Sequence, residues 1–363
     1  MVENVWITVN RNCNLRCKWC YAKSTDYNKE DIMSLNLAKE LIDFSKAINA
    51  KSITLIGGEP TIYPHIFELI KYVKISGLRS TLVTNGYLLS DNNYLNKLKN
   101  IGLDMVWFSI KAANRQQKID LTGIDCFEKI KKAMHNLSNS KGIKYAYSTV
   151  ISKDTIDNIE EFAEMVSQNS PQKGLNFSFC NPYFENGVKD ECVMTREEIV
   201  KNTTKKFHLV SKILKNKAIL QQSVPECFWP EDFLDSLRSK KQLSFGCHVM
   251  KRNGLIFDTK GKVLVCNNLP DYPIAIYGKD FKDKDSFEKF WKSNEIIKLY
   301  DKIYEYPDIK CQTCKKYSKC AGGCAIKWFS YKGLPQIEEN FYVKIRNKLI
   351  CISINYFEFI CLF

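Results

Sequence analysis

Strand-like and helix-like patterns alternate from Val5 to about Lys217, and this alternation constrains the fold more than any other feature. The apolar runs are short and rich in β-branched residues, and the segments between them repeat apolar residues at helical spacing. Expected strands cover residues 5–9, 52–56, 80–84, 105–110, 144–151 and 176–180. Expected helices cover residues 35–47, 65–76, 92–100, 126–137 and 156–168.

A sixth helix is expected to begin after Thr195, which forms a capping-box pattern with Glu198, and to run towards Lys215. Six strand–helix units in a row predict an α/β fold with a parallel sheet covered by helices. Closed or partly closed, such a sheet is a TIM-like (β/α)6 barrel. Active sites of these barrels lie at the carboxyl ends of the strands.

Residues able to bind a metal or a ligand stand at four of these strand ends. They are Cys13, Cys17 and Cys20 after the first strand, Gly57, Gly58, Glu59 and Pro60 after the second, Asn85 after the third, and Ser109 near the end of the fourth. The three cysteines have the spacing C-x3-C-x2-C. A four-iron, four-sulfur cubane is normally held by four thiolates, so three leave one iron open. An open metal position is what a reactive site needs.

The cysteine loop, with Trp19 before Cys20, and the sequence Gly57-Gly58-Glu59-Pro60 together resemble the radical S-adenosylmethionine (SAM) enzymes. This resemblance implies an open, partial barrel. It also implies that SAM chelates the open iron and is cleaved to a 5′-deoxyadenosyl radical that abstracts hydrogen from a substrate. A zinc knuckle, or chance spacing in a cysteine-rich chain, is the alternative.

Gly57 and Gly58 lack a Cβ, so we expect the backbone there to approach a ligand and to take positive φ. Glu59 can accept a charge-assisted hydrogen bond, and the resemblance implies that it binds the SAM amino group. Asn85 and Ser109 correspond to positions that contact the methionyl or ribose part, although such residues also cap helices. Trp19 is expected beside the cluster, with a simple hydrophobic role as the alternative.

A second cysteine pattern, C-x13-G-x4-C followed by C-x2-C-x5-C-x3-C and one more Cys, begins at Cys247. It resembles the SPASM extension, which holds two auxiliary four-iron clusters in radical SAM maturases. The resemblance assigns Cys247, Cys266 and Cys324 to the first auxiliary cluster, which has an open iron or a non-Cys ligand. It assigns Cys311, Cys314, Cys320 and Cys351 to the second, with Cys361 competing for the last place. A zinc ribbon is the alternative.

The expected organisation is a barrel over residues 1–216, a bridging segment over 217–246 without clear periodicity, and a SPASM domain over 247–363. Four cysteines fit neither pattern, and we expect them to be buried free thiols. They are Cys126, Cys180, Cys192 and Cys227. Cys180, at the end of the sixth strand, is the best-placed candidate to donate hydrogen to a substrate radical.

The charge composition limits the kinds of partner that the chain is expected to bind. The chain has 54 Lys and Arg against 40 Asp and Glu, a formal net charge of +14. This balance suits an acidic peptide or an acidic electron carrier such as flavodoxin or ferredoxin. A nucleic-acid role is not expected, because the basic residues are not interleaved with aromatic ones as in stacking grooves. Neither a 20-residue apolar run nor a signal peptide is evident, so a cytoplasmic location without membrane contact is expected.

The two cysteine patterns together predict a maturase that cross-links a ribosomally made peptide through a thioether or carbon–carbon bond. A sulfatase-maturing, formylglycine-generating enzyme is the first alternative, but those relatives place Asp where this chain has Asn267. A zinc-binding nucleic-acid interaction protein is an alternative of another class. Because the first strand begins almost at Met1, we expect a leader peptide to dock on the barrel rim or on a separate recognition protein.

Overall fold

The structure is a computed structural model. It describes residues 2–330 except 23–27, 182–183, 186–187, 190–191, 246, 271–272 and 305–308. The two cysteines proposed for the last cluster ligand, Cys351 and Cys361, lie outside the described residues.

An eleven-stranded sheet organises the described chain, in the order β10-β9-β6-β5-β4-β3-β2-β1-β11-β12-β13. The strands β1 to β6 pair in parallel with their neighbours, as expected for strand–helix units. Their bounds are β1 Asn4–Asn10, β2 Ser52–Gly57, β3 Arg79–Thr84, β4 Met105–Ile110, β5 Lys144–Ile151 and β6 Leu175–Phe179. The predicted open α/β barrel is therefore confirmed, and the six strands lie within a few residues of their expected ranges.

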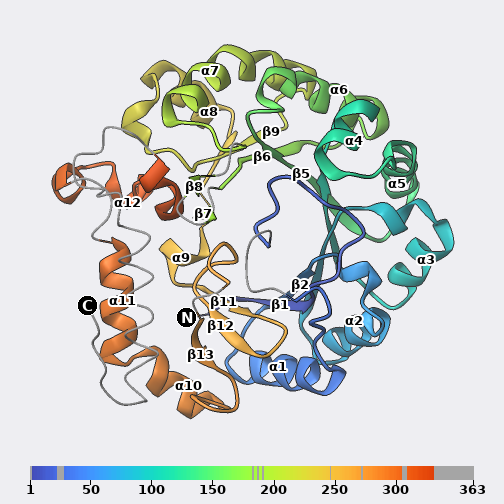
Figure 1. The fold of residues 1–363 in the computed structure, drawn as a ribbon, viewed down its shortest axis with the longest axis vertical. Coiled ribbons are helices and arrows are strands. Elements are labelled where there is room, and N and C mark those ends of the chain that lie inside the picture. The colour runs from blue at the N-terminus through green and yellow to red at the C-terminus, as the bar shows by residue number, and fades with distance from the viewer. Residues whose placement is uncertain are drawn as a thin grey trace.

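Helices form an outer layer around these strands (Figure 1). They are α1 Leu35–Ala47, α2 Ile66–Ile75, α3 Asn92–Asn100, α4 Arg115–Thr122, α5 Phe127–Asn139, α6 Ile159–Asn169 and α7 Arg196–Ile213. The capping box at Thr195 and Glu198 opens α7 as predicted. Helix α4 was not predicted, because its mostly polar sequence has little amphipathic periodicity.

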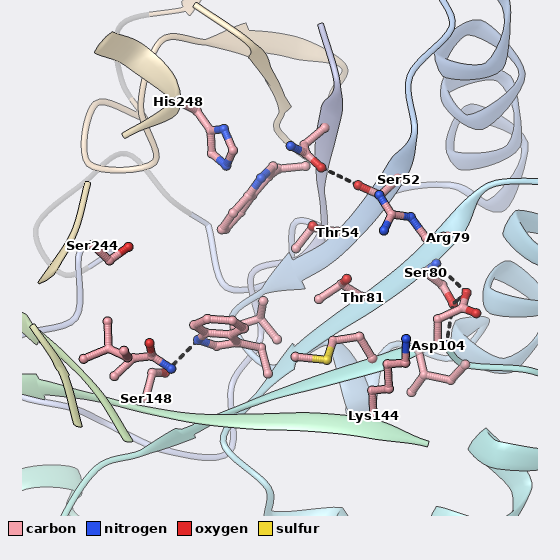
Figure 2. Close-up of a pocket in the computed structure, with 18 of the residues that line it drawn as sticks. Ser52, Thr54, Arg79, Ser80, Thr81, Asp104, Lys144, Ser148, Ser244 and His248 are labelled. Carbon is pink, nitrogen blue, oxygen red and sulfur yellow. Dashed lines mark hydrogen bonds between the residues drawn. The ribbon is translucent and has the colours of Figure 1, made fainter. Parts of the chain in front are cut away.

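The inner face of the barrel carries polar and apolar side chains and lines a cavity of about 930 Å³ (Figure 2). Thr54, Thr81 and Ser148 project from the middle of their strands into it, and Ser148 accepts a hydrogen bond from Trp107 Nε1 at 2.9 Å. Lys144, Arg79 and Asp104 lie at the amino ends of the strands that enclose it. This lumen is accessible, unlike the side-chain-filled core of a complete TIM barrel.

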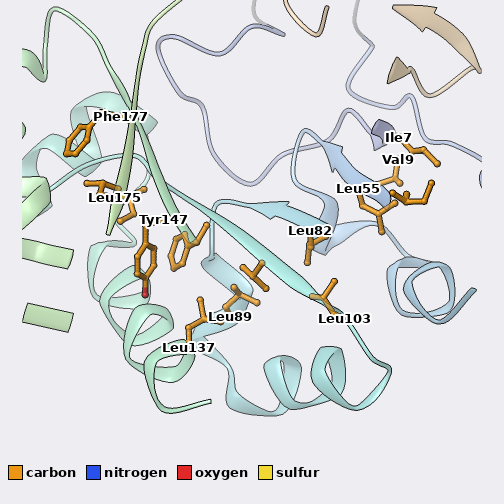
Figure 3. Close-up of a cluster of buried hydrophobic side chains, with 14 of the residues drawn as sticks. Ile7, Val9, Leu55, Leu82, Leu89, Leu103, Leu137, Tyr147, Leu175 and Phe177 are labelled. Carbon is orange, nitrogen blue, oxygen red and sulfur yellow. The ribbon is translucent and has the colours of Figure 1, made fainter. Parts of the chain in front are cut away.

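The outer face of the sheet carries the hydrophobic core (Figure 3). Ile7, Leu55 and Leu82 are fully buried against the helices, as are Leu137 and Phe177. Alternate residues of each strand point to opposite faces, which separates this core from the lumen. Burying each such side chain contributes about 1.5–3 kcal/mol, so the barrel has a large stabilising core of its own.

The segment 217–246 contributes to the same sheet rather than only connecting two parts. It contains β9 Ala218–Gln221, α8 Glu231–Ser239 and β10 Leu243–Ser244, and β9 pairs in parallel with β6. These elements were missed in the sequence because each is short. The domain boundaries placed at residues 216 and 246 remain a prediction.

The cysteine-rich region joins the opposite side of the sheet. Strand β11 pairs in parallel with β1, and β12 and β13 follow it in antiparallel order. The strands of this region are β11 Gly254–Phe257, β12 Lys262–Leu264 and β13 Pro273–Ile276, and its helices are α9 His248–Lys251, α10 Lys284–Trp291, α11 Asn294–Tyr304 and α12 Tyr317–Cys320. Earlier in the chain, β7 Phe184–Glu185 and β8 Val188–Lys189 form a separate two-stranded sheet. Phe44 of α1 contacts the rings of Phe257 and Phe287 at 6.1 and 5.4 Å between centroids. The two regions thus share a sheet and an aromatic core. Among the described helices, none is long and apolar enough to cross a membrane.

Candidate functional site

The cysteine loop that follows β1 is tied to the end of β2 by three hydrogen bonds. The Gly58 N–H donates to the Asn10 carbonyl oxygen at 2.9 Å, and the Glu59 N–H donates to that of Asn12 at 2.9 Å. In return, Asn10 Nδ2 donates to the Glu59 carbonyl oxygen at 3.0 Å. The two predicted motifs therefore meet at the carboxyl ends of neighbouring strands.

The other side of the loop rests on the end of α4. The Arg16 N–H donates to the Thr122 carbonyl oxygen at 2.8 Å, and the Lys18 N–H donates to that of Leu121 at 3.0 Å. These bonds hold the backbone on both sides of Cys17. The unpredicted helix is thus one of the two supports of the loop.

The three thiols of the loop influence one another electrostatically. Burial, with Glu59, Cys17 and Cys20 nearby, raises the pKa of Cys13 to about 12. Burial also raises the pKa of Cys17, which Cys20 raises further and Lys111 and Lys118 oppose. The Leu15 N–H donates to Cys13 Sγ at 3.4 Å. Three thiols on one loop within electrostatic range of one another, with a backbone donor, fit a four-iron cluster that has one open corner, and the nearby ammonium groups favour the thiolate form that binds metal.

Lys111 and Lys118 were missed in the sequence. Lys118 is only 1% exposed, and burial lowers its pKa while Cys126 and Cys17 oppose the shift. Lys111 Nζ donates to Ser109 Oγ at 2.7 Å, so the predicted Ser109 position is linked to the cluster loop through this cation. Lysine side chains are usually exposed to solvent, and no signal short of the fold marks Lys118 as buried and Lys111 as half-buried beside a thiol.

Gly57 and Gly58 are required for close backbone packing. A Cβ on Gly58 would lie 2.2 Å from the Asn12 carbonyl oxygen, and one on Gly57 would lie 2.5 Å from that of Asn10. The expectation that these glycines take positive φ is wrong, since neither is among the positive-φ residues. The missing side chains make room for the cysteine loop itself.

Glu59 is 1% exposed and connects the ends of β2 and β3. Its Oε1 accepts hydrogen bonds from the Thr61 N–H at 3.1 Å and from the hydroxyls of Thr61 and Thr84 at 2.6 Å each. Its Oε2 accepts the Asn85 N–H at 2.7 Å. Burial raises the pKa of Glu59, and these hydrogen bonds oppose the shift. A carboxylate oxygen has two lone pairs, so Oε2 retains acceptor capacity for an ammonium group.

Asn85 fixes the loop rather than standing free. Its Nδ2 donates to Asn14 Oδ1 at 2.7 Å, and its Oδ1 accepts the Tyr87 N–H at 3.0 Å. Pro60 opens the short helix η1, Pro60–Ile62, which Glu59 caps. SAM contacts of Glu59, Asn85 and Ser109 remain predictions, and the structure adds a positioning role to each.

Trp19 lies in a small buried cluster with Leu121 and Cys180, against which Cys17 packs. Cys180 directly follows β6, and its N–H donates to the Ile151 carbonyl oxygen at 2.8 Å. Burial of Cys126, Cys180 and Cys192 is confirmed. The candidate hydrogen donor and the cluster loop thus border the same apolar patch.

Cys247, Cys266 and Cys324 form a second electrostatic group. Burial raises the pKa of Cys324 to about 12, and Cys247 and Cys266 raise it further. Burial likewise raises the pKa of Cys266, where Cys247 adds to the shift and Asn268 opposes it by donating to the sulfur. The three residues assigned to one auxiliary cluster by resemblance therefore lie near one another, although they come from three separate segments.

This second group adjoins the barrel. The Cys324 thiol donates to Asn181 Oδ1 at 3.9 Å, and Lys327, 1% exposed, donates from Nζ to the Cys180 carbonyl oxygen at 2.7 Å. Lys327 also lowers the pKa of Cys324. Burial raises the pKa of Tyr21 to about 12, with contributions from Cys20, Cys13 and Cys266. Tyr21 therefore lies within electrostatic range of both thiol groups.

Cys314 and Cys320 lie near each other and form a third group. Cys311 lies one turn before Cys314, because the Cys314 N–H donates to the Cys311 carbonyl oxygen at 3.2 Å. In the part of the chain that the structure describes, no three Cys, His, Asp or Glu side chains are placed to bind a single metal ion.

The large barrel cavity is lined by neither the cysteine loop nor Glu59 and lies towards the amino ends of the strands.

Comparison with protein-family models matches residues 7–166 to the model described as the Radical SAM superfamily. Residues 7–166 therefore form a radical SAM domain, as the cysteine loop predicted. This domain implies SAM and a four-iron cluster as cofactors, and the thiols of Cys13, Cys17 and Cys20 are the residues that fit the cluster.

Two curated relatives differ in how much of the chain they cover. A Methanosarcina barkeri protein named Fe-coproporphyrin III synthase is 31% identical over 45% of this chain and 40% of its own length, so the match spans less than half of that relative. An Oleidesulfovibrio alaskensis protein named AdoMet-dependent heme synthase is 23% identical over 91% of this chain and 84% of its own length.

Two solved proteins share the fold along nearly the whole chain. Native anSMEcpe with bound AdoMet has a TM-score of 0.68, with 18% identity and 98% coverage of both chains. Streptococcus suis SuiB bound to precursor peptide SuiA has a TM-score of 0.63, with 17% identity, 93% coverage of this chain and 76% of SuiB. At such identities the likeness concerns the fold alone.

Proposed function

We propose that this chain is a radical SAM maturase with a SPASM-type C-terminal region, and that it cross-links side chains of a ribosomally made peptide. The observation that carries the proposal is the position of Cys180 and Asn181. This one strand end contacts the cluster loop through Trp19 and the second thiol group through Cys324 and Lys327. A substrate bound there would lie between two redox centres.

The residues of the chain have distinct tasks in this proposal. Bound SAM and its cluster supply the radical that abstracts hydrogen from the substrate. Glu59 and Asn85 orient the cofactor, because both are already fixed by hydrogen bonds from neighbouring strand ends. Cys247, Cys266 and Cys324 would hold an auxiliary cluster, which would supply an acceptor for an electron from the substrate, and the Lys327 ammonium group would stabilise negative charge there.

The fold likeness to anSMEcpe and to SuiB, the latter bound to a precursor peptide, supports a peptide substrate. The basic composition supports docking of an acidic electron carrier, such as flavodoxin or ferredoxin, in the cytoplasm. Formylglycine generation remains the rival peptide reaction, and Asn267 in place of an Asp disfavours it.

The test is a mass measurement under anaerobic conditions. Reduced, cluster-loaded protein is incubated with SAM and candidate precursor peptides, and we expect 5′-deoxyadenosine together with loss of two hydrogens per cross-link. Conversion of a Cys or Ser to an aldehyde would show the formylglycine reaction instead. Absence of 5′-deoxyadenosine from fully loaded protein would refute the proposal as a whole.

A tetrapyrrole substrate is the second candidate, favoured by the relative named heme synthase that aligns over 91% of this chain. The same incubation should therefore include iron-coproporphyrin III. Oxidative decarboxylation of its propionates, seen as loss of carbon dioxide and two hydrogens per propionate together with formation of 5′-deoxyadenosine, would replace the peptide by a tetrapyrrole as substrate.

A further inference from the structure

Cys227 is an exposed cysteine that fits neither sequence pattern. The expectation that it is a buried thiol is therefore wrong. It lies in the short helix η4, Glu226–Phe228, between β9 and α8. An exposed thiol is open to oxidation unless it binds a metal or another partner. Its surroundings supply a role.

The segment that carries Cys227 packs directly on the segment that carries Cys320 and Cys324. The Cys324 N–H donates to the Ser223 carbonyl oxygen at 2.9 Å. A Cβ on Gly323 would lie only 2.5 Å from the same oxygen, so the two backbones are in close contact. On the other side of Cys227, Lys316 Nζ lies 2.6 Å from Glu231 Oε2. Cys227 is thus held between two fixed points.

The contact nearest to Cys227 involves a sulfur. The Glu226 N–H donates to Cys320 Sγ at 3.3 Å, in a buried position. Backbone donors to cysteine sulfur are typical of iron–sulfur sites, where they adjust the reduction potential. The residue next to Cys227 therefore already contacts one thiol assigned to the second auxiliary cluster.

We propose that Cys227 is a ligand of the second auxiliary cluster, together with Cys311, Cys314 and Cys320. This assignment rests on the proposed function, which places a cluster at these cysteines. It completes four thiolates within the described residues, whereas the resemblance gave the fourth place to Cys351 or Cys361. The bridging segment 217–246 then closes the cluster site and is not only a connection.

The electrostatics agree with this placement. Cys320, Cys314 and Arg196 all lie within electrostatic range of the Cys227 thiol. The Arg196 guanidinium also stacks on the Phe228 ring, 3.9 Å from its centroid. Arg196 begins α7, so the barrel itself fixes the orientation of η4 and places a cation beside the thiolate.

The experiment isolates the auxiliary clusters. In a Cys13→Ala, Cys17→Ala, Cys20→Ala background, anaerobically reconstituted protein should hold about eight irons, four per cubane. We expect Cys227→Ala to lose the electron paramagnetic resonance signal of one reduced cluster and to give a three-iron signal after oxidation. Cys351→Ala should retain both reduced signals. Cys126→Ala, which removes a buried thiol outside both C-terminal groups, is the matched control.

The variant Cys227→Ser distinguishes loss of a cluster ligand from a change in the local structure. A serine oxygen can replace the thiolate, so we expect the cluster to be retained with shifted g-values and potential. Signals of wild-type shape in Cys227→Ala, or wild-type g-values in Cys227→Ser, would overturn the assignment alone. A background protein without iron would overturn the proposed clusters and this ligand with them.

Discussion

The two cysteine regions of this chain are built in opposite ways. In the radical SAM domain, three thiols lie within residues 13–20, on one loop between β1 and the end of α4. In the C-terminal region, the group of Cys247, Cys266 and Cys324 draws on three separate segments. The first arrangement can be recognised from the spacing of neighbouring residues in the sequence. The second exists only after β11 has paired with β1 and segment 217–246 has packed.

The largest expected effect separates the two regions directly. Cys17→Ala removes one of the three loop thiols, so SAM cleavage should fall to the background without enzyme, because the cofactor then has no cluster to bind. The iron bound by the C-terminal region should remain. We would measure 5′-deoxyadenosine by chromatography and iron per chain, with Cys192→Ala as the control. Retained cleavage would show that the loop does not hold the reactive cluster.

The converse change should uncouple the two regions. In Cys311→Ala, 5′-deoxyadenosine should still form, whereas the modified peptide should fall to background, because the first auxiliary cluster can then no longer pass the electron from the substrate on to the second. Quantifying both products in one reaction gives their ratio. Equal loss of both products would mean that SAM cleavage also requires Cys311, and that the two cysteine regions do not act separately.

Most of the barrel could be predicted from the sequence, because strands and the apolar faces of helices leave periodic signals. Strands β4 and β5 have the expected bounds. Helix α4 could not be predicted, since it is short and polar yet supports the loop around Cys17. The cysteine loop and Glu59 were recognised from local motifs, which require only a few neighbouring residues.

The rest of the site depends on contacts between distant residues. Lys327 reaches the carbonyl of Cys180, 147 positions away, and the Glu226 N–H reaches Cys320, 94 positions away. No spacing rule connects such pairs, because their proximity follows from the order of strands in the sheet. For the same reason Cys227 was taken for a buried thiol. Sequence thus identifies ligands on one loop better than ligands gathered by the fold.

A more moderate effect is expected at Glu59, where the local motif is supported by the sheet. Glu59→Gln keeps the shape but removes the charge, so the KM for SAM should rise roughly tenfold, or about 1.4 kcal/mol. Thr84→Val is the matched control, since it removes one donor to the carboxylate and leaves the charge. Equal effects of the two variants on KM would indicate that Glu59 only joins β2 to β3.

The smallest effect tests whether the barrel is stable without its clusters. Tyr63, 1% exposed, donates to the Met33 carbonyl oxygen at 3.0 Å, and burial raises the pKa of its phenol to about 12. Unfolded tyrosine ionises near pH 10, so the stabilisation from the protonated phenol is fully present below that pH and is lost as the pH rises through about 12. Tyr63→Phe should cost about 0.5–1.5 kcal/mol at neutral pH, and the difference should shrink under alkaline conditions. Urea unfolding of iron-free protein at several pH values measures this. A difference that stays constant up to pH 12 would mean that the phenol is not buried in the iron-free barrel, and that this region needs its cluster in order to fold around Tyr63.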